Sequence, residues 1–413
     1  MIESQTSWLV SARHGFLAGV GFVDHCEVLV VGDRIAWVGY DGSTDPRPDV
    51  SSATAATFAG GTILPGLIDA HVHLTFSGLS DTVDVLRAED DLDSTVRALG
   101  NAQRALRYGV TTQVDCGSRG TAIARLRDSI LAGLATGPRI LTAGPPLTTT
   151  AGHCHWLGGH ADTVDEVIRG ARSRVADGSD VVKLMLTGGN MTAGSNPGAL
   201  QYPVATMYAL GAEAIRLGKP LVVHAHSTEA VRAAAEGGAT VIAHATCLAD
   251  GRYEVDDATL AVLLASGSFV DPTLTVGIAR EGADDRTVAR SRVRQSMIPV
   301  YQRMHAAGVP LLAGTDGGST HVEHHAVARA VSALHHEVGL TVEEALHSAT
   351  DQPATAYGLR GQTGALEPGL AADLIVVKGD VRSDVSSLAE PLAVWARGRL
   401  VHGVRDHREG AIA

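Results

Sequence analysis

Short apolar runs alternate with longer helical segments along most of this chain, and this alternation limits the fold more than any other feature. Most of the longer segments, such as STVRALGNAQRALRYG and STEAVRAAAEGG, carry apolar residues at helical spacing and end at glycine, a common helix stop. We interpret eight runs as strands: TILPGLIDAHVHL, GVTTQVDCG, RILTAGPPL, DVVKLMLTGG, PLVVHAHS, ATVIAHATCL, SFVDPTLTV and VPLLAGTDGG. Eight βα units in roughly 300 residues predict an α/β fold, a (β/α)8 TIM barrel with insertions.

The two ends of the chain are rich in strand patterns instead. HCEVLVVGD and RIAWVGY lie near the start, and ADLIVVKGD and AVWARGRLVHG lie near the end. We therefore expect both termini to build one small β-sandwich beside the barrel. The predicted boundaries are 1–62 for the first part of the sandwich, 63–362 for the barrel and 363–413 for the second part of the sandwich.

Charge and composition exclude several classes of protein. The 413 residues include 33 basic and 45 acidic side chains, a net charge of −12 with no basic stripe, which disfavours nucleic-acid binding. No apolar run reaches the roughly 20 residues that cross a bilayer, and MIESQTSWLV has an acid where a signal peptide carries basic residues. The four cysteines are scattered singly, so we expect reduced thiols in a cytoplasmic protein.

The strongest chemical signal is the pair His71 and His73 at the end of the first barrel strand. Residues i and i+2 of a strand face the same way, and barrel active sites lie at the carboxyl ends of the strands. Two imidazoles at this position make half of a transition-metal site. Without further partners, two hydrogen-bonded surface histidines would explain the pattern equally well.

Further candidate ligands follow on later strands. Lys183 lies inside the apolar run DVVKLML, where an unpaired ammonium is costly to desolvate. Either the side chain reaches the rim or pairs with an acid, or its amine is neutral and carries a CO2-derived carbamate that bridges two metal ions. His224 and His226 end the next strand, His244 ends the one after, and Asp316 ends the last strand. A single strand-end histidine is more often structural, but successive strands that each end in a metal-binding side chain favour a metal centre.

GLIDAHVHL, DVVKLMLTGG, VVHAHS, VIAHATCL and GTDGG together resemble the amidohydrolase superfamily, in its binuclear subtype with a carbamylated lysine. Within it, TAGHCHWLGGHAD followed by DVVKLMLTGGNMT is similar to the imidazolonepropionase-like group. That group includes prolidase-type (Xaa-Pro), Xaa-Arg carboxypeptidase-type and ochratoxin-hydrolysing enzymes. True imidazolonepropionases lack the bridging lysine, so Lys183 is evidence against that activity.

The resemblance implies a ligand set for two divalent metal ions, with zinc favoured by the nitrogen and oxygen donors. His71, His73 and Asp316 would hold one ion, His224 and His244 the other, and carbamylated Lys183 would bridge them. His226 with Glu229 forms HxxE, which mononuclear members use with metal, so His226 is either a ligand or a catalytic substrate contact. His153 and His155 are further candidates for substrate binding, although a packing role explains them equally well.

Other side chains carry weaker signals. Arg119 and Arg280 are candidate anion partners, although a surface position is the ordinary interpretation of an arginine. His321, His324 and His325 follow Asp316 and could line the mouth of the pocket, but a solvated helix start is the better interpretation.

The function that follows is hydrolysis of an amide or peptide C–N bond in a dipeptide, a C-terminal peptide bond or an N-acyl amino acid. A water between the two metals would become hydroxide near neutral pH, and Asp316 would take up its proton and pass it to the leaving nitrogen. The alternatives are a cyclic amide, lactone, carbamate or other ester substrate, and, more remotely, a non-catalytic scaffold. We expect a small-molecule or peptide substrate, no nucleic-acid or membrane partner, and a homo-oligomer.

Overall fold

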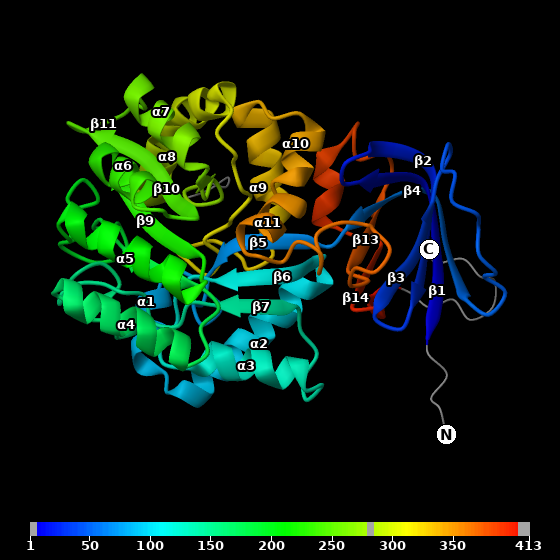
Figure 1. Ribbon diagram of the computed structural model, residues 1–413, viewed down its shortest axis with the longest axis horizontal. Helices are drawn as coiled ribbons and strands as arrows, with labels where there is room; N and C mark the ends of the chain where they lie inside the picture. The colour runs from blue at the N-terminus through cyan, green and yellow to red at the C-terminus, as the bar shows by residue number, and fades with distance from the viewer. Residues whose placement is uncertain (1–5, 279–284, 404–413) are drawn as a thin grey trace.

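The computed structural model describes residues 6–278 and 285–403, and it has a larger βα part and a smaller β part (Figure 1). Strands and helices alternate in the βα part, as the sequence predicts. Its strands are β5 (Leu67–Val72), β6 (Val110–Asp115), β7 (Arg139–Thr142), β8 (Val182–Met185), β9 (Leu221–Ser227), β10 (Val241–Ala249), β11 (Arg252–Tyr253) and β12 (Phe269–Asp271). Its helices are α1 (Thr82–Ala88), α2 (Asp91–Arg107), α3 (Ala122–Leu131), η1 (His155–Leu157), α4 (Val164–Ala176), α5 (Val204–Leu217), α6 (Thr228–Glu236), α7 (Asp257–Ser266), α8 (Asp285–Ala307), α9 (Val327–Ala333), η2 (Leu334–Val338), α10 (Val342–His347) and α11 (Asp351–Ala356).

The parallel strands form two sheets. One has the order β5-β6-β7, and the other has the order β11-β10-β9-β8 with β12 paired to β10. Backbone hydrogen bonds also link flanking segments to these strands. Leu147, after β7, donates to the carbonyl of Lys183 in β8 and accepts from the amide of Met185, at 2.9 Å each. The amide of Leu312 donates to the carbonyl of Val270 in β12 at 2.8 Å. Except for β11, which pairs antiparallel with β10, the paired strands run in one direction, so their carboxyl ends lie at the same edge.

Seven of the eight predicted barrel strands are present among the described residues, and the eighth segment is different. Residues 309–318 make only isolated bridges, one from Leu311 to β12 and one from Gly317 to β5. The backbone of Asp316 has a φ of 54° and that of Gly318 a φ of 94°. Left-handed residues end an extended strand, so this segment turns into the site before it can form a longer ladder.

The β part draws on both ends of the chain, as predicted. Its strands form one seven-stranded sheet in the order β15-β14-β13-β4-β1-β2-β3. Their bounds are β1 (Ser7–Leu17), β2 (Gly21–Val31), β3 (Arg34–Gly39), β4 (Thr54–Pro65), β13 (Leu374–Lys378), β14 (Ala393–Ala396) and β15 (Arg399–His402), with the 3-10 helix η3 (Val385–Ala389) between β13 and β14.

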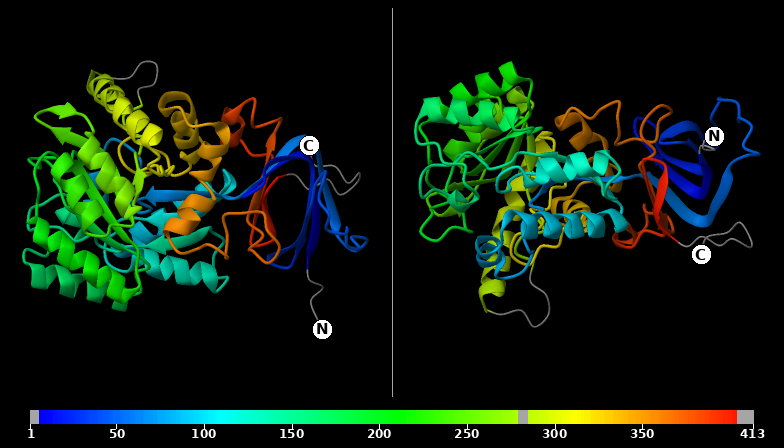
Figure 2. Two further views of the ribbon diagram at one scale, coloured as in Figure 1. Left: turned by 45° about the horizontal axis from the view of Figure 1, so that its top comes forward. Right: turned by 90° about the horizontal axis from the view of Figure 1, so that it is seen from below.

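The predicted pair of packed sheets is not confirmed, because the described strands form a single, strongly curved sheet (Figure 2). Two strands, β13 and β4, lie between Trp395 of β14 and Trp8 of β1 in the sheet, yet the two ring centroids are 5.8 Å apart. The sheet therefore curls around its own apolar side. The domain boundaries stay a prediction, and β4 runs across the first of them.

Two further expectations concern the cysteines and membrane-spanning segments. All four cysteines are free and buried. Among the described residues, no helix combines the length and apolarity that crossing a bilayer would require.

Candidate metal centre

A cavity of about 690 Å³ opens at the carboxyl ends of the parallel strands. Its lining brings together side chains from four strands and from the segment after α8. Among its lining residues are the six predicted metal ligands and the ambiguous histidine: His71, His73, Lys183, His224, His226, His244 and Asp316.

The first group consists of His71, His73 and Asp316, whose donor atoms lie within 4.8 Å of one another. Oδ1 of Asp316 is 3.2 Å from Nε2 of His73 and 3.8 Å from Nε2 of His71. His73 donates through Nδ1 to the carbonyl of Gly117 at 2.9 Å, and this bond aims Nε2 into the group. A carboxylate and two imidazoles at this spacing suit a divalent transition metal.

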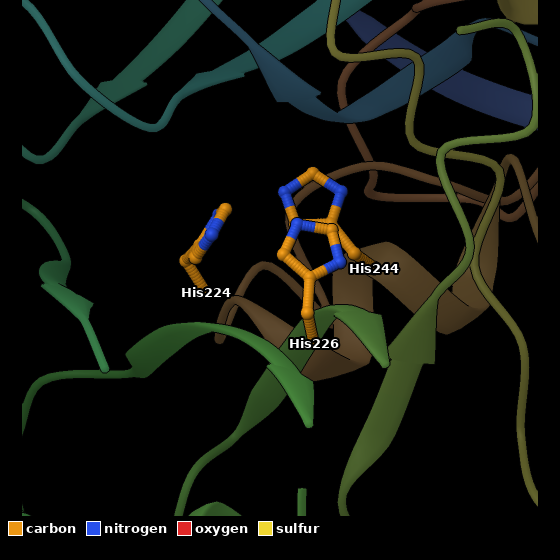
Figure 3. Close-up of side chains that lie close together, drawn as sticks. All are labelled: His224, His226 and His244. Carbon is orange, nitrogen blue, oxygen red and sulfur yellow. The ribbon is translucent and has the colours of Figure 1, made fainter. Parts of the chain in front are cut away.

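The second group consists of His224, His226 and His244, whose rings converge (Figure 3). The ring centroids are 4.6 to 4.8 Å apart. The hydroxyl of Thr246 donates to the His226 carbonyl at 3.0 Å, so it accepts from Nδ1 of His226 at 3.2 Å and leaves a lone pair on Nε2. His224 donates through Nε2 to the Gly188 carbonyl at 2.9 Å, which leaves the lone pair on Nδ1.

The HxxE pattern does not bring its acid to the cavity. Glu229 lies in the first turn of α6 and is exposed, and it is not part of the cavity lining. His226 therefore joins the second group through His224 and His244 rather than through Glu229.

Lys183 lines the same cavity as the two groups and is only 2% exposed. Its Nζ atom has no hydrogen-bond partner within the described part of the chain. The side chain therefore neither reaches the rim nor pairs with an acid, which were the ordinary explanations. A buried amine without a partner is what an added carbamate would complete.

Burial and neighbouring charges set the protonation of the site. Burial lowers the pKa values of His71, His224 and His244 well below the ordinary range, and neighbouring cationic groups lower them further. Burial works against ionisation of Asp316, but the hydrogen bond from His73 and the nearby imidazoles lower the pKa of this carboxyl far below its ordinary value. Burial opposes a charge on His73, but its pairing with Asp316 raises its pKa above the ordinary value. A bound cation would take the place of that proton, because neutral imidazoles and an ionised carboxylate are the forms that bind metal.

Strained backbone concentrates at this edge. His244, Thr273 and Asp316 have φ values of 67°, 48° and 54° although none is glycine. Such conformations cost about 1–3 kcal/mol each and persist where the surroundings enforce them, often at functional sites.

The loop histidines divide between the cavity and other places. His153 is buried in the lining, with its ring centroid 4.7 Å from that of His224, and burial lowers its pKa to about 3. His155 lies outside the lining and donates to the carbonyl of Gly152 at 3.0 Å. His321 lines the mouth. The solvated position expected for His324 is wrong, since it is buried with Nε2 donating to the His73 carbonyl at 3.0 Å.

Two more candidates lie away from the cavity. His325 stacks on Tyr108 with ring centroids 4.1 Å apart. Arg119 donates to the backbone carbonyls of Leu86 and Glu89 and so supports the end of α1 instead of binding an anion. Arg280 lies outside the described residues.

Sequence reasoning missed the buried acids behind the ligands. Asp69 accepts hydrogen bonds from the hydroxyl of Thr315 at 2.6 Å and from the amide of His71 at 3.1 Å, which ties β5 to the segment that carries Asp316. Burial raises the pKa of Asp69 to about 8. Asp271 contacts His71 from behind. The available signal was an acid within or at the end of an apolar strand, the same signal that identified Asp316.

A mixed α/β fold with two groups of metal-binding side chains at the carboxyl ends of its strands defines a class of metal-dependent hydrolases. The amidohydrolase family matches residues 62–401, so the chain belongs to this family, and it is a hydrolytic enzyme.

Individual relatives agree with this placement. The ochratoxinase of Aspergillus niger is 28% identical over 413 residues, covering 91% of this chain and 82% of that protein. The imidazolonepropionase of Agrobacterium fabrum is 26% identical over 393 residues, covering 87% of this chain and 85% of that protein. A crystal structure of a prolidase complexed with N-methylphosphonate-L-proline has a TM-score of 0.80 and 27% identity, and covers 96% of this chain and 99% of that one. These relatives confirm the resemblance to the group with imidazolonepropionase, prolidase and ochratoxinase members.

Proposed function

We propose that this enzyme hydrolyses an amide or peptide C–N bond in a dipeptide, a C-terminal peptide bond or an N-acyl amino acid. The observation that carries the proposal is the convergence of both histidine groups with the buried, partnerless Lys183 in one cavity. The relatives support it, because the names of two of them, ochratoxinase and prolidase, denote enzymes of amide hydrolysis.

We further infer that the two parallel sheets belong to one (β/α)8 barrel. The bonds of Leu147 to β8, of Leu312 to β12 and of Asp316 to β5 support this arrangement. It would place every candidate ligand at the carboxyl-end rim, where barrel enzymes carry their active sites.

The donor set fits two divalent metal ions, with zinc favoured by its nitrogen and oxygen atoms. His71, His73 and Asp316 would hold one ion and His224 and His244 the other, with a carbamate on Lys183 between them. Bound ions would supply a water of lowered pKa as the nucleophile and an electrophile for the carbonyl oxygen.

The protein side chains would manage the protons. Asp316 is ionised at neutral pH, so it would accept a proton from the attacking water and return it to the leaving nitrogen. Burial lowers the pKa of His226 to about 4, so this ring is neutral at pH 7. Its Nε2 lone pair suits a metal or a substrate N–H group better than a substrate carboxylate.

The cavity walls support a substrate with an apolar group. The apolar side chains in the cavity lining include Tyr253, Leu274, Val276, Val293 and Met297. Large apolar side chains that line a cleft favour an aliphatic or aromatic portion of the ligand.

Two arginines in the lining differ in their freedom to bind a carboxylate. Arg294 is held by Glu337 through hydrogen bonds of 2.6 and 2.7 Å. Arg290 is exposed and would be the cation that a substrate carboxylate meets at the mouth.

A hydrolysis screen tests the proposal. Zinc- and bicarbonate-loaded protein is assayed against N-acyl amino acids and dipeptides with large or small apolar groups, and against lactones and carbamates. We expect the highest kcat/KM for carboxylate-bearing amides with a large apolar group. We also expect Asp316→Asn to lower kcat by about 10²–10⁴-fold, the usual contribution of a general acid-base group.

Other outcomes would point elsewhere. Turnover of a neutral ester or carbamate without turnover of any carboxylate-bearing amide would replace the proposed substrate class. Full activity of metal-loaded Asp316→Asn would remove the role of Asp316. The predicted homo-oligomer can be checked on the same samples by light scattering.

A further inference from the structure

The turn that follows β12 places one polar side chain behind each group of histidines. Asp271 is fully buried, and its Oδ2 lies 2.9 Å from Nδ1 of His71 in the first group. The hydroxyl of Thr273 lies 2.8 Å from Nδ1 of His244 in the second group. Only one residue, Pro272, separates Asp271 from Thr273 along the chain, so a single turn reaches both groups.

Asp271 lies behind the ligand and not in the site. His71 lines the cavity whereas Asp271 does not, and the carboxylate is also bound by the amide of Thr273 at 3.2 Å. A Cβ atom at Gly314 would lie 2.4 Å from both carboxylate oxygens, so the glycine leaves just enough room for them. The carboxylate is therefore fixed from three sides and can fix the imidazole in turn.

The backbone of the turn is strained where it delivers the second contact. Thr273 is β-branched and adopts a left-handed φ of 48°, an unusual conformation for such a residue. Pro272 before it has a restricted φ, which stiffens the turn. Strain held in place at a site, together with a hydroxyl aimed at a ligand, points to a positioning role.

We propose that the turn Asp271–Thr273 positions both halves of the metal centre: Asp271 holds His71 as the tautomer with the proton on Nδ1 and a free Nε2, and the hydroxyl of Thr273 holds the ring of His244 through Nδ1. Oδ1 of Asp271 accepts from the amide of Thr273 and Oδ2 faces Nδ1 of His71, so an accepting Oδ2 selects the Nδ1–H form of His71. Such outer partners of ligating histidines typically change metal affinity 10–100-fold when they are replaced. The inference rests on the proposed metal centre, and it adds that the two halves share one support.

Metal affinity tests the proposal through four variants. Asp271→Asn and Thr273→Val each remove one support, Thr273→Ser keeps the hydroxyl, and Thr112→Val makes the same change at a buried threonine on β6 whose hydroxyl has no partner. We expect chelator competition to show 10–100-fold weaker zinc binding for Asp271→Asn and about 10-fold weaker binding for Thr273→Val. Thr273→Ser and Thr112→Val should bind like the wild type.

A second measurement does not depend on metal or on activity. Nitrogen-15 NMR of the metal-free wild type should show His71 protonated at Nδ1, and Asp271→Asn should shift His71 towards the Nε2–H form. A wild-type His71 ring protonated at Nε2, or zinc binding by Asp271→Asn and Thr273→Val equal to that of Thr112→Val, would overturn the proposal. If the wild type bound no metal, the proposed metal centre would fail, whereas the tautomer measurement would still judge the positioning role.

Discussion

At the scale of single residues, the sequence could predict the ligands but not their supports. Strand-end histidines at i and i+2, and a lysine inside an apolar run, are visible in a short window of sequence. The bond between His71 and Asp271 joins residues 200 positions apart. Such a contact depends on how strands are packed side by side, and no local pattern encodes it.

Lys183 offers the sharpest test of a single residue, because the chain has only three lysines, Lys183, Lys219 and Lys378. We expect carbon-13 NMR of protein prepared with labelled bicarbonate to show one carbamate resonance, since only Lys183 has a buried amine without a partner. Lys183→Met should abolish the resonance. It should also lower activity by at least about 100-fold, because loss of a direct metal ligand should cost no less than loss of an outer hydrogen-bond partner of a ligand. Lys378→Met, at an exposed strand end, should leave both unchanged. A resonance that survives in Lys183→Met would assign the carbamate elsewhere.

At the scale of elements, two helical glycines differ in a way that only the structure shows. A Cβ atom at Gly211 of α5 would lie 1.6 Å from the carbonyl oxygen of Gly237, whereas one at Gly100 of α2 would meet nothing within 4 Å. We predict that Gly100→Ala raises the free energy of unfolding by about 0.5–1 kcal/mol and that Gly211→Ala lowers it by about 1–3 kcal/mol. Denaturant titration measures both. A stabilised Gly211→Ala would mean that α5 and the end of α6 do not approach so closely.

The packing of α4 against α5 predicts a pH dependence. Hydrogen bonds from Arg216 and Arg172 lower the pKa of Glu213 to about 2 from an ordinary value of 4.5. Because the folded pKa is depressed, this ion pair stabilises the fold fully above pH 4.5, and the contribution is lost as the pH falls towards 2. The Tm gap between the wild type and Glu213→Gln should therefore be constant from pH 6 to 8 and should shrink below pH 4.5. Glu390→Gln, at an exposed position, is the control, and a gap that widened in acid would contradict the assignment.

The elements themselves were largely predictable, with one instructive exception. Seven apolar runs form parallel strands because each combines β-branched residues with burial on both faces. The eighth run looks alike in sequence, but Asp316 and Gly318 adopt left-handed conformations there. Burial of Asp316 next to His73 outweighs the preference of the apolar run for an extended backbone. The pattern of hydrophobic residues alone does not reveal this competition.

At the scale of the whole molecule, the pairing of the two termini was predictable and the shape of their sheet was not. Strand-like sequence patterns at both ends of the chain predicted one shared β domain. In the structure, β4 pairs with β1 on one side and with β13 on the other. Whether such strands form two sheets or one depends on curvature. Here one sheet curls until Trp8 reaches Trp395, so a single sheet encloses a core of its own.

The central claim is that both histidine groups, with Lys183 between them, hold two metal ions in one catalytic cavity. Its most direct test is the number of ions per chain, measured by mass spectrometry on protein loaded with zinc and bicarbonate and then freed of loosely bound metal. We predict two zinc ions per chain for the wild type. Fewer than one bound ion per wild-type chain would contradict the claim and return the non-catalytic scaffold as the better account.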